Sequence, residues 1–225
     1  MKRWELLNRL AEHVRATRYV EIGVQGGECF RNVRVPIWKV GVDPDRSSAA
    51  THHETSDGYY ARLDALVSSG ETSRAAESVD LVFVDGLHHA EQVSRDVANA
   101  LRYLRHPGAV VLHDVNPPTE EAAAVPMRSG AIWCGDVWRA WLDLRATLLD
   151  HDLFVVDTDL GCGVILPLLP GAGRRAPFVV PEERRTWSDF ARDRAEWLRL
   201  VSVEEFLRIL DEREASLTVR PWRSA

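Results

Sequence analysis

Short apolar runs alternate with helical apolar patterns over the first three quarters of the chain. Continuous β-branched runs of this length are typical of buried parallel strands. They cover residues 18–22, 37–43, 78–85 and 106–114, with a weaker candidate at 49–56. Apolar residues at helical spacing lie at 3–16, up to about 33, 57–68, 93–104 and 136–149. Strands separated by helices predict βαβ units and a parallel sheet.

The pattern changes near residue 153. Residues 153–167 predict two strands joined by a tight turn at 158–161, which are therefore antiparallel. We expect an α/β fold with a Rossmann-like sheet of seven strands, mostly parallel with the last strand antiparallel, and helices on both faces. A domain is expected at 1–170, followed at 171–225 by a linker and a C-terminal helical tail.

Composition narrows the protein class. With 45% hydrophobic and 28% charged residues the chain is typical of a soluble globular protein. The net charge of −6 and the lack of a basic run argue against a nucleic-acid partner. No apolar window is long enough for a membrane span, so a cytoplasmic location is expected. The scattered Cys29, Cys134 and Cys162 argue against a disulfide framework and a cysteine zinc site.

Glycines follow the carboxyl end, or exit, of the first predicted strand. In parallel sheets ligands bind at the carboxyl ends of strands, near the point where the strand order reverses. The exit reads EIGVQGG, with Glu21, Gly23, Gly26 and Gly27. Glycines let a ligand approach the backbone, but the spacing lacks the nicotinamide fingerprint. A glycine turn that serves only the fold is the alternative.

The next two exits carry acids. Asp43 lies 22 residues after Glu21, where an acid can accept the ribose hydroxyls of an adenosine-type ligand. The alternative is a surface aspartate before Pro44. The sequence TSDGYY supplies Ser56 and Asp57, which could approach the amine of adenine, cap the following helix, or both.

The last two exits combine carboxylates with histidines. If their strands are neighbours, Asp85 and Asp114 converge and need a proton, an arginine or a divalent cation. His88, His89 and His113 lie nearby in sequence, and imidazole with carboxylate suits Mg, Mn, Fe or Zn. The alternatives are a polar helix start for the histidine pair, and a His113 side chain that strand alternation turns away from Asp114.

Six segments, in order over residues 15–167, resemble the class I S-adenosylmethionine-dependent methyltransferases. They are YVEIGVQGG, VGVDP, TSDGYY, VDLVFVDGLHHAEQVSRDVANALRYLRHPGAVVLHDVNPP, GDVW and VDTDLGCGVI. The resemblance is closest to the bacterial methyltransferase family 24 group. It implies S-adenosylmethionine as cofactor, with binding residues Glu21, Gly23, Gln25, Gly27, Asp43, Ser56, Asp57 and Asp85.

The resemblance also implies a set of candidate metal ligands. Macrolide sugar O-methyltransferases, which are more distant relatives, bind magnesium through one acid at the fourth strand exit and two consecutive acids at the fifth. These positions are Asp85, His113 and Asp114 here. Because a histidine replaces one acid, a softer metal or no metal is the alternative to magnesium.

The expected reaction is O-methylation of a small-molecule or sugar hydroxyl in natural-product or polysaccharide tailoring. A hydroxyl needs a base or a metal, and histidine titrates near cellular pH. His88 is the candidate base, Asp85 and Asp114 would hold a metal or the acceptor, and His113 would support them. The acceptor partner would be a sugar or a glycosylated natural product.

Three other interpretations of the function stay open. They are N-methylation on the same fold, a nucleotide-dependent oxidoreductase, and a non-catalytic adenosyl-binding protein. The glycine spacing argues against the oxidoreductase, and the grouping of Asp85, His88 and Asp114 argues against loss of catalysis. The loop at 116–136, which includes Trp133, Ser129 and Gly130, is interpreted as a lid or as a surface loop. The sequence leaves a homo-oligomer open.

Overall fold

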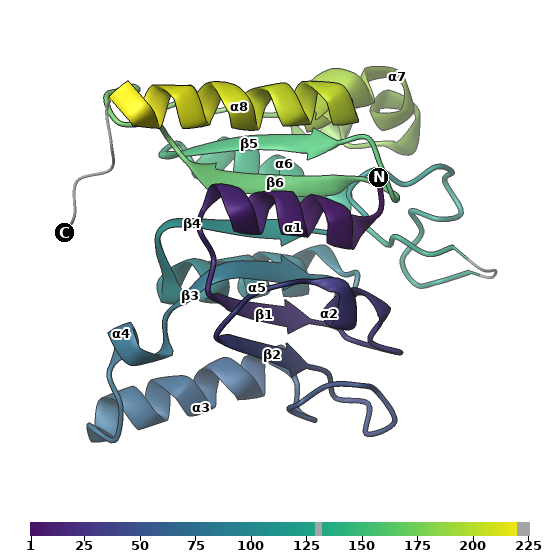
Figure 1. Cartoon of the computed structure of the whole chain (residues 1–225). Helices are drawn as coiled ribbons and strands as arrows, with labels where there is room; N and C mark the ends of the chain where they lie inside the picture. The colour runs from purple at the N-terminus through teal and green to yellow at the C-terminus, as the bar shows by residue number, and fades with distance from the viewer. Residues whose placement is uncertain (129–131, 220–225) are drawn as a thin grey trace. The chain divides into compact units, whose positions relative to one another are not determined.

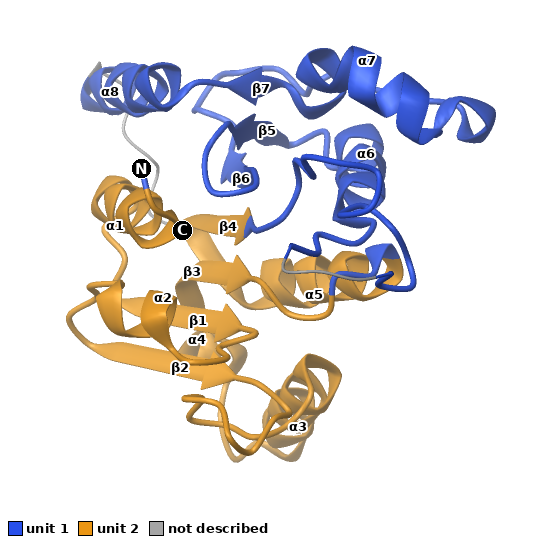
Figure 2. Ribbon diagram, turned by 90° about the vertical axis from the view of Figure 1, so that its right-hand side faces the viewer, with its two compact units in different colours: residues 1, 88–90, 112–225 blue, residues 2–87, 91–111 orange. Residues whose placement is uncertain are grey.

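The computed structural model describes residues 1–128 and 132–219 and divides into two units. Unit 2 holds residues 2–87 and 91–111, and unit 1 holds residue 1, residues 88–90 and the chain from 112 onward (Figure 2). Ser129 and Gly130, the irregular part of the expected lid, lie outside the described residues.

Unit 2 is built on parallel strands. They are β1 (Arg18–Ile22), β2 (Trp38–Val42), β3 (Val79–Val84) and β4 (Leu104–Leu112), whose last residue belongs to unit 1. Their order is β2-β1-β3-β4. β1 pairs in parallel with β2 and β3, so that Ile22 lies level with Val42 and Val84. All six residues of β3 are buried, as its unbroken apolar sequence predicts.

The helices of unit 2 lie on both sides of these strands. They are α1 (Arg3–His13), α2 (Glu28–Asn32), α3 (Ser56–Ser69), α4 (Arg74–Glu77) and α5 (Ala90–Tyr103). Figures 1 and 2 show α1 and α2 on one face and α5 on the opposite face. The apolar stripe of α5, with Val93, Val97 and Ala100, is buried, which explains its helical spacing.

Unit 1 contains the antiparallel pair. β5 (His151–Val156) pairs antiparallel with β6 (Cys162–Pro167) and parallel with β7 (Leu200–Val201). The connecting turn places Asp159, Leu160 and Gly161 in left-handed conformations, which lets the chain reverse over a few residues.

The other elements of unit 1 are helical. They are α6 (Val137–Thr147), η1 (Glu182–Arg184), α7 (Trp187–Leu198) and α8 (Val203–Val219). α6 and α7 lie on one side of the strands and α8 on the other (Figures 1 and 2). α7 and α8 lie within residues 171–225, where a linker and a C-terminal helical tail were expected. The domain division at residue 170 stays a prediction.

The expected fold class is confirmed: seven strands, mostly parallel with one antiparallel pair, together with helices. One assignment is wrong, because residues 49–56 form no strand. Only His52 makes an isolated bridge, to Val42. The polar side chains of THHETS cannot all be buried in a sheet, and Thr51 instead uses its hydroxyl to bind the backbone of Gly41.

The seventh strand is β7, which the sequence did not indicate. Two residues are too few to show the alternation or apolar run that identifies a strand. None of the helices in the described part of the chain is long and apolar enough to cross a membrane.

Candidate functional site

Three strand ends of unit 2 meet at one edge. Because β1, β2 and β3 are parallel and end level, the residues that follow them, Gly23, Asp43 and Asp85, emerge side by side. β1 lies between the other two, so the chain moves first to one side of β1 and then to the other. This is the point of strand-order reversal at which open parallel sheets bind ligands.

Gly23 is the point of closest approach at this edge. Its φ is +83°, and a Cβ built there would lie 2.0 Å from the carbonyl oxygen of Asp85. Its N–H donates to the carbonyl of Val42 at 2.8 Å, while the N–H of Asp85 donates to the carbonyl of Ile22 at 2.8 Å. Glycine is therefore required here by the fold, whatever ligand the edge binds.

Asp43 is a buried organising residue rather than a surface aspartate, with a relative exposure of 7%. Its Oδ2 accepts the N–H groups of Val24 and Gln25, both at 2.9 Å. Its Oδ1 accepts the N–H of Asp45 at 2.9 Å. The carboxylate thus holds the loop that follows β1, in which Gln25 has a positive φ of 45°.

A pocket of about 430 Å³ opens at this edge, within the size range of small-molecule and cofactor sites. Its walls include six of the eight cofactor residues expected from the sequence: Gly23, Gln25, Asp43, Ser56, Asp57 and Asp85. The remaining two, Glu21 and Gly27, line a second pocket of about 300 Å³. The two pockets share Gly23, Gln25 and Asp85, so all eight residues border one continuous stretch of surface.

The end of the pocket near α3 carries polar groups from two helices. Ser56 is buried and Asp57 exposed, and Gln92 of α5 donates its side-chain amide to both, at 3.2 and 3.4 Å. Thr55 caps α3, because its hydroxyl accepts the N–H of Gly58 at 3.1 Å. The capping interpretation of Ser56 and Asp57 is therefore wrong.

The lining includes polar side chains that were not predicted as site residues, among them Gln92 and Arg3. Nη1 of Arg3 lies 2.8 Å from Asp85 Oδ2. Arg3 provides the positive charge that the partly buried Asp85 needs. No sequence signal separates Arg3 from the other charged residues of its amphipathic helix.

Glu21 is the most deeply buried acid of the second pocket, with 1% relative exposure. Burial raises the pKa of Glu21 to about 7, and this outweighs the hydrogen bond that the Tyr19 hydroxyl donates to it. Glu21 therefore titrates near neutral pH.

Two of the histidines expected at the site, His88 and His113, lie in unit 1 beside Asp114. Nε2 of His88 lies 3.2 Å from Asp114 Oδ2, and Nδ1 of His113 lies 2.8 Å from the same oxygen. The alternation argument for His113 fails, because β4 ends at Leu112 and Asp114 has a left-handed φ of 60°. His88 is not an exposed helix start either, since its side chain is only 14% exposed and α5 begins at Ala90.

The two ring nitrogens of His88 face different partners. Nδ1 of His88 lies 2.8 Å from the carbonyl oxygen of Trp133, which can only accept, so Nδ1 carries a hydrogen. This contact fixes the orientation of the ring and leaves Nε2 directed towards the carboxylate of Asp114.

Two further features surround this pair. Oδ1 of Asp114 is buried and has no hydrogen-bond partner among the described residues. Nε2 of His113 lies 3.8 Å from Asp159 Oδ1, a residue that the sequence indicated only as part of a tight turn.

The residues expected to bind a metal are divided between the two units. His113 and Asp114 belong to unit 1 and Asp85 to unit 2. The metal set of Asp85, His113 and Asp114 therefore stays a prediction.

Comparison with known proteins finds one matching family model and several solved structures of similar fold. Residues 20–115 match the family model Methyltransf_24, described as a methyltransferase domain. No curated protein matches the sequence. Among solved structures, a putative O-methyltransferase from Klebsiella pneumoniae is 19% identical with a TM-score of 0.50, covering 73% of this chain and 79% of that chain.

A second similar structure is the O-methyltransferase TomG from Streptomyces achromogenes, involved in tomaymycin synthesis and solved in complex with S-adenosylmethionine. It is 21% identical with a TM-score of 0.49, covering 73% of this chain and 78% of that chain. The similarity in fold is shown by the Klebsiella structure, which has the TM-score of 0.50. The family match spans all the predicted site residues, from Glu21 to Asp114.

Replacing Gly23 by alanine should destabilise the protein by about 2 kcal/mol or more, because the methyl group collides with backbone and the positive φ is unfavourable. Gly26→Ala is the matched control, since nothing lies within 4 Å of its Cβ position. It should change stability by less than about 0.5 kcal/mol. Urea unfolding of both variants measures this, and equal stabilities would contradict the close approach of Gly23 to Asp85.

Glu21 should make stability depend on pH. The folded protein keeps the proton of Glu21 up to about pH 7, whereas the unfolded chain releases it near the ordinary value of 4.5. The contribution to stability is therefore complete below pH 4.5 and is lost as pH rises towards 7, by up to about 3 kcal/mol.

The measurement is urea unfolding at several pH values for the wild type, Glu21→Gln and the exposed control Glu12→Gln. The difference between wild type and Glu21→Gln should vary with pH in that window, while the difference for the control should stay flat. A flat difference for both variants would show that Glu21 titrates normally.

Proposed function

We propose a function on the premise that the chain has the class I methyltransferase fold, with a methyltransferase domain at residues 20–115. The protein is an S-adenosylmethionine-dependent methyltransferase that methylates a hydroxyl group of a small molecule, such as a sugar or a glycosylated natural product. The observation that carries this proposal is the pocket at the ends of β1, β2 and β3, where the residues expected to bind the cofactor lie together.

The residues present fit the cofactor. A carboxylate has about four acceptor positions, and the three N–H groups on Asp43 leave capacity for a ribose hydroxyl. The polar group formed by Ser56, Asp57 and Gln92 suits the adenine edge. Gly23 leaves the pocket wall without a side chain.

The second pocket suits the amino-acid part of the cofactor. Glu21 supplies an acid there that is ionised above about pH 7, and a cationic ammonium group would favour its ionised form. Gly27 adds a turn with positive φ at the start of α2. When bound, S-adenosylmethionine supplies a methyl group on a positively charged sulfur, which transfers to an acceptor lone pair.

The task of the remaining residues is to take a proton from the acceptor. His88 directly follows Leu87, a wall of the pocket, along the chain. We assign the base role to the pair of His88 and Asp114, which would take the proton of the acceptor hydroxyl. His113 donates to Asp114 and holds it in position.

A hydroxyl acceptor follows from this pair. An alcohol must lose its proton for efficient methylation, whereas a neutral amine already offers a lone pair, so a proton-holding pair favours O-methylation. The buried Oδ1 of Asp114 provides an acceptor for the hydroxyl hydrogen. A divalent metal on Asp85, His113 and Asp114 remains a separate proposal, and none of the steps above depends on it.

Calorimetric titration with S-adenosylhomocysteine tests the cofactor pocket. We expect saturable binding by the wild type and at least about tenfold weaker binding by Asp43→Asn, because a charge-assisted hydrogen bond is lost. Asp45→Asn is the control, since its side chain is exposed and binds only Ser47 and neighbouring backbone. Absence of binding by the folded wild type would refute the proposed cofactor.

Turnover tests the base. With an acceptor that the wild type methylates, His88→Gln should lower kcat by about 100-fold or more. Its affinity for S-adenosylhomocysteine should stay close to that of the wild type. His89→Gln, which changes the neighbouring histidine, should retain most of the activity. If His88→Gln lost cofactor affinity in parallel with turnover, the role of His88 would be structural.

A further inference from the structure

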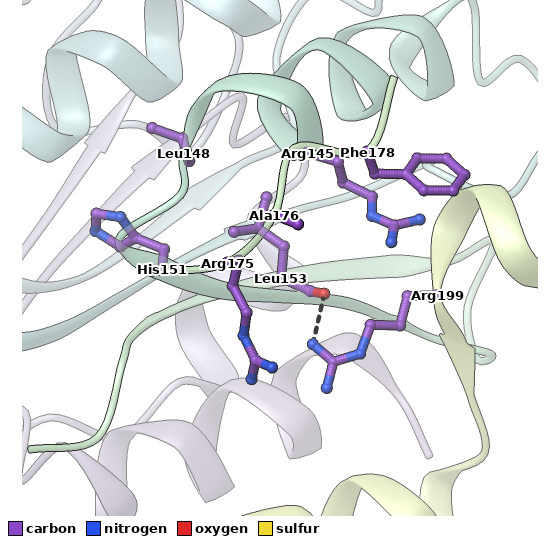
Figure 3. A pocket seen from close by; sticks show the side chains of 8 residues that line it. All are labelled: Arg145, Leu148, His151, Leu153, Arg175, Ala176, Phe178 and Arg199. Atoms are coloured by element: carbon purple, nitrogen blue, oxygen red, sulfur yellow. Dashed lines mark hydrogen bonds between the residues drawn. The ribbon is translucent and has the colours of Figure 1, made fainter. Parts of the chain in front are cut away.

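Unit 1 contains a pocket of about 240 Å³ that the proposed function does not use (Figure 3). Three arginines from different parts of the chain line it: Arg145 of α6, Arg175 after β6 and Arg199 at the end of α7. Leu148, Leu153 and Phe178 provide apolar walls. Arginines lining a small pocket are an arrangement that recognises anions.

Arg145 is held in place without a carboxylate. Its Nη1 donates to the carbonyls of Glu196 and Trp197 at 2.6 and 2.8 Å, near the end of α7. Its guanidinium lies 3.9 Å from the centre of the Phe178 ring. Among the residues that the structure describes, no acid forms an ion pair with Arg145. Its charge is therefore fixed in position without a direct ion pair.

The other arginines share a single acid. Oδ1 of Asp152 accepts from Arg175 at 2.8 Å and from Arg199 at 2.5 Å. Its Oδ2 lies 3.5 Å from Nη1 of Arg213. Three guanidinium groups thus surround one carboxylate, and Arg145 adds a fourth positive charge beside them. Figure 3 shows the side chains of Arg175 and Arg199 extending next to each other along the pocket.

Burial and the neighbouring arginine both act on the guanidinium of Arg145. Burial first, and the charge of Arg199 second, lower the pKa of Arg145 to about 10. Glu196 partly offsets this shift, and Asp150 is exposed and pairs with Arg174 at 2.7 Å. A bound anion would relieve this repulsion.

We propose that this pocket binds a phosphate-type oxyanion, held by Arg145, Arg175 and Arg199. A planar guanidinium donates two parallel hydrogen bonds to a pair of phosphate oxygens, and three of them can surround a tetrahedral anion. The volume suits inorganic phosphate or the phosphoryl group of a small metabolite. Leu153 and Phe178 would contact the carbon part of such an ester. The proposal is independent of methyl transfer.

Calorimetry on the full chain in phosphate-free buffer at constant ionic strength tests the site. The probes are inorganic phosphate and phenyl phosphate, with phenol as the neutral control. We expect saturable binding of both anions and none of phenol. Tighter binding of phenyl phosphate than of phosphate identifies an organic phosphate as the ligand, whereas equal affinities identify the free anion. Absence of saturable binding of either anion refutes the site.

Variants locate the site. Arg145→Gln keeps donors for the two carbonyls but removes the charge, and Arg175→Gln changes a side chain that is 54% exposed and tolerant of substitution. Each should weaken phosphate binding about tenfold or more. Arg174→Gln, an exposed neighbour outside the pocket, should leave the affinity unchanged.

Circular dichroism and thermal unfolding check that the variants fold. If Arg145→Gln fails to fold, Arg175→Gln decides the question alone. Equal weakening by Arg174→Gln would indicate non-specific charge attraction, and unchanged affinity in both pocket variants would exclude these arginines as ligands. Either result overturns the proposal, and neither bears on cofactor binding or turnover.

Discussion

The contact between the exits of β1 and β3 is the constraint on which the candidate site depends. The carbonyl oxygen of Asp85 occupies the space where a side chain of residue 23 would begin, so only glycine allows these strands to end side by side. The left-handed turn at Gly23 then leads the chain to Val24 and Gln25, whose N–H groups bind Asp43. The pocket between these residues follows from that packing.

Buried and partly buried carboxylates in this structure are compensated by specific partners. Asp43 is stabilised by three backbone N–H groups, Asp85 by Arg3, and Asp114 by two histidines. Each buried or partly buried carboxylate thus has a specific partner, as the cost of desolvation requires. The arginines around Asp152 are the exception, because their positive charge exceeds the negative charge beside them.

Parts of this fold could be predicted from the sequence, and parts could not. Local sequence patterns predict the buried strands β1 and β3 and the tight turn between β5 and β6. These elements can be predicted because their patterns are local and several residues long. The strand expected at residues 49–56 does not form, because Thr51 in that polar stretch binds the backbone of Gly41 through its side chain and only His52 makes a bridge. β7 was missed because two residues carry no pattern.

The amino-acid sequence was sufficient to identify the residues that follow β1, β2 and β3, because parallel strands end at one edge whatever their loops do. What each polar group faces depends on the three-dimensional packing. The left-handed Asp114 lies next to the His113 ring, Arg3 contacts Asp85 across 82 positions, and three arginines contact Asp152. Such contacts depend on long-range packing and on single backbone angles, which no local pattern of residues encodes.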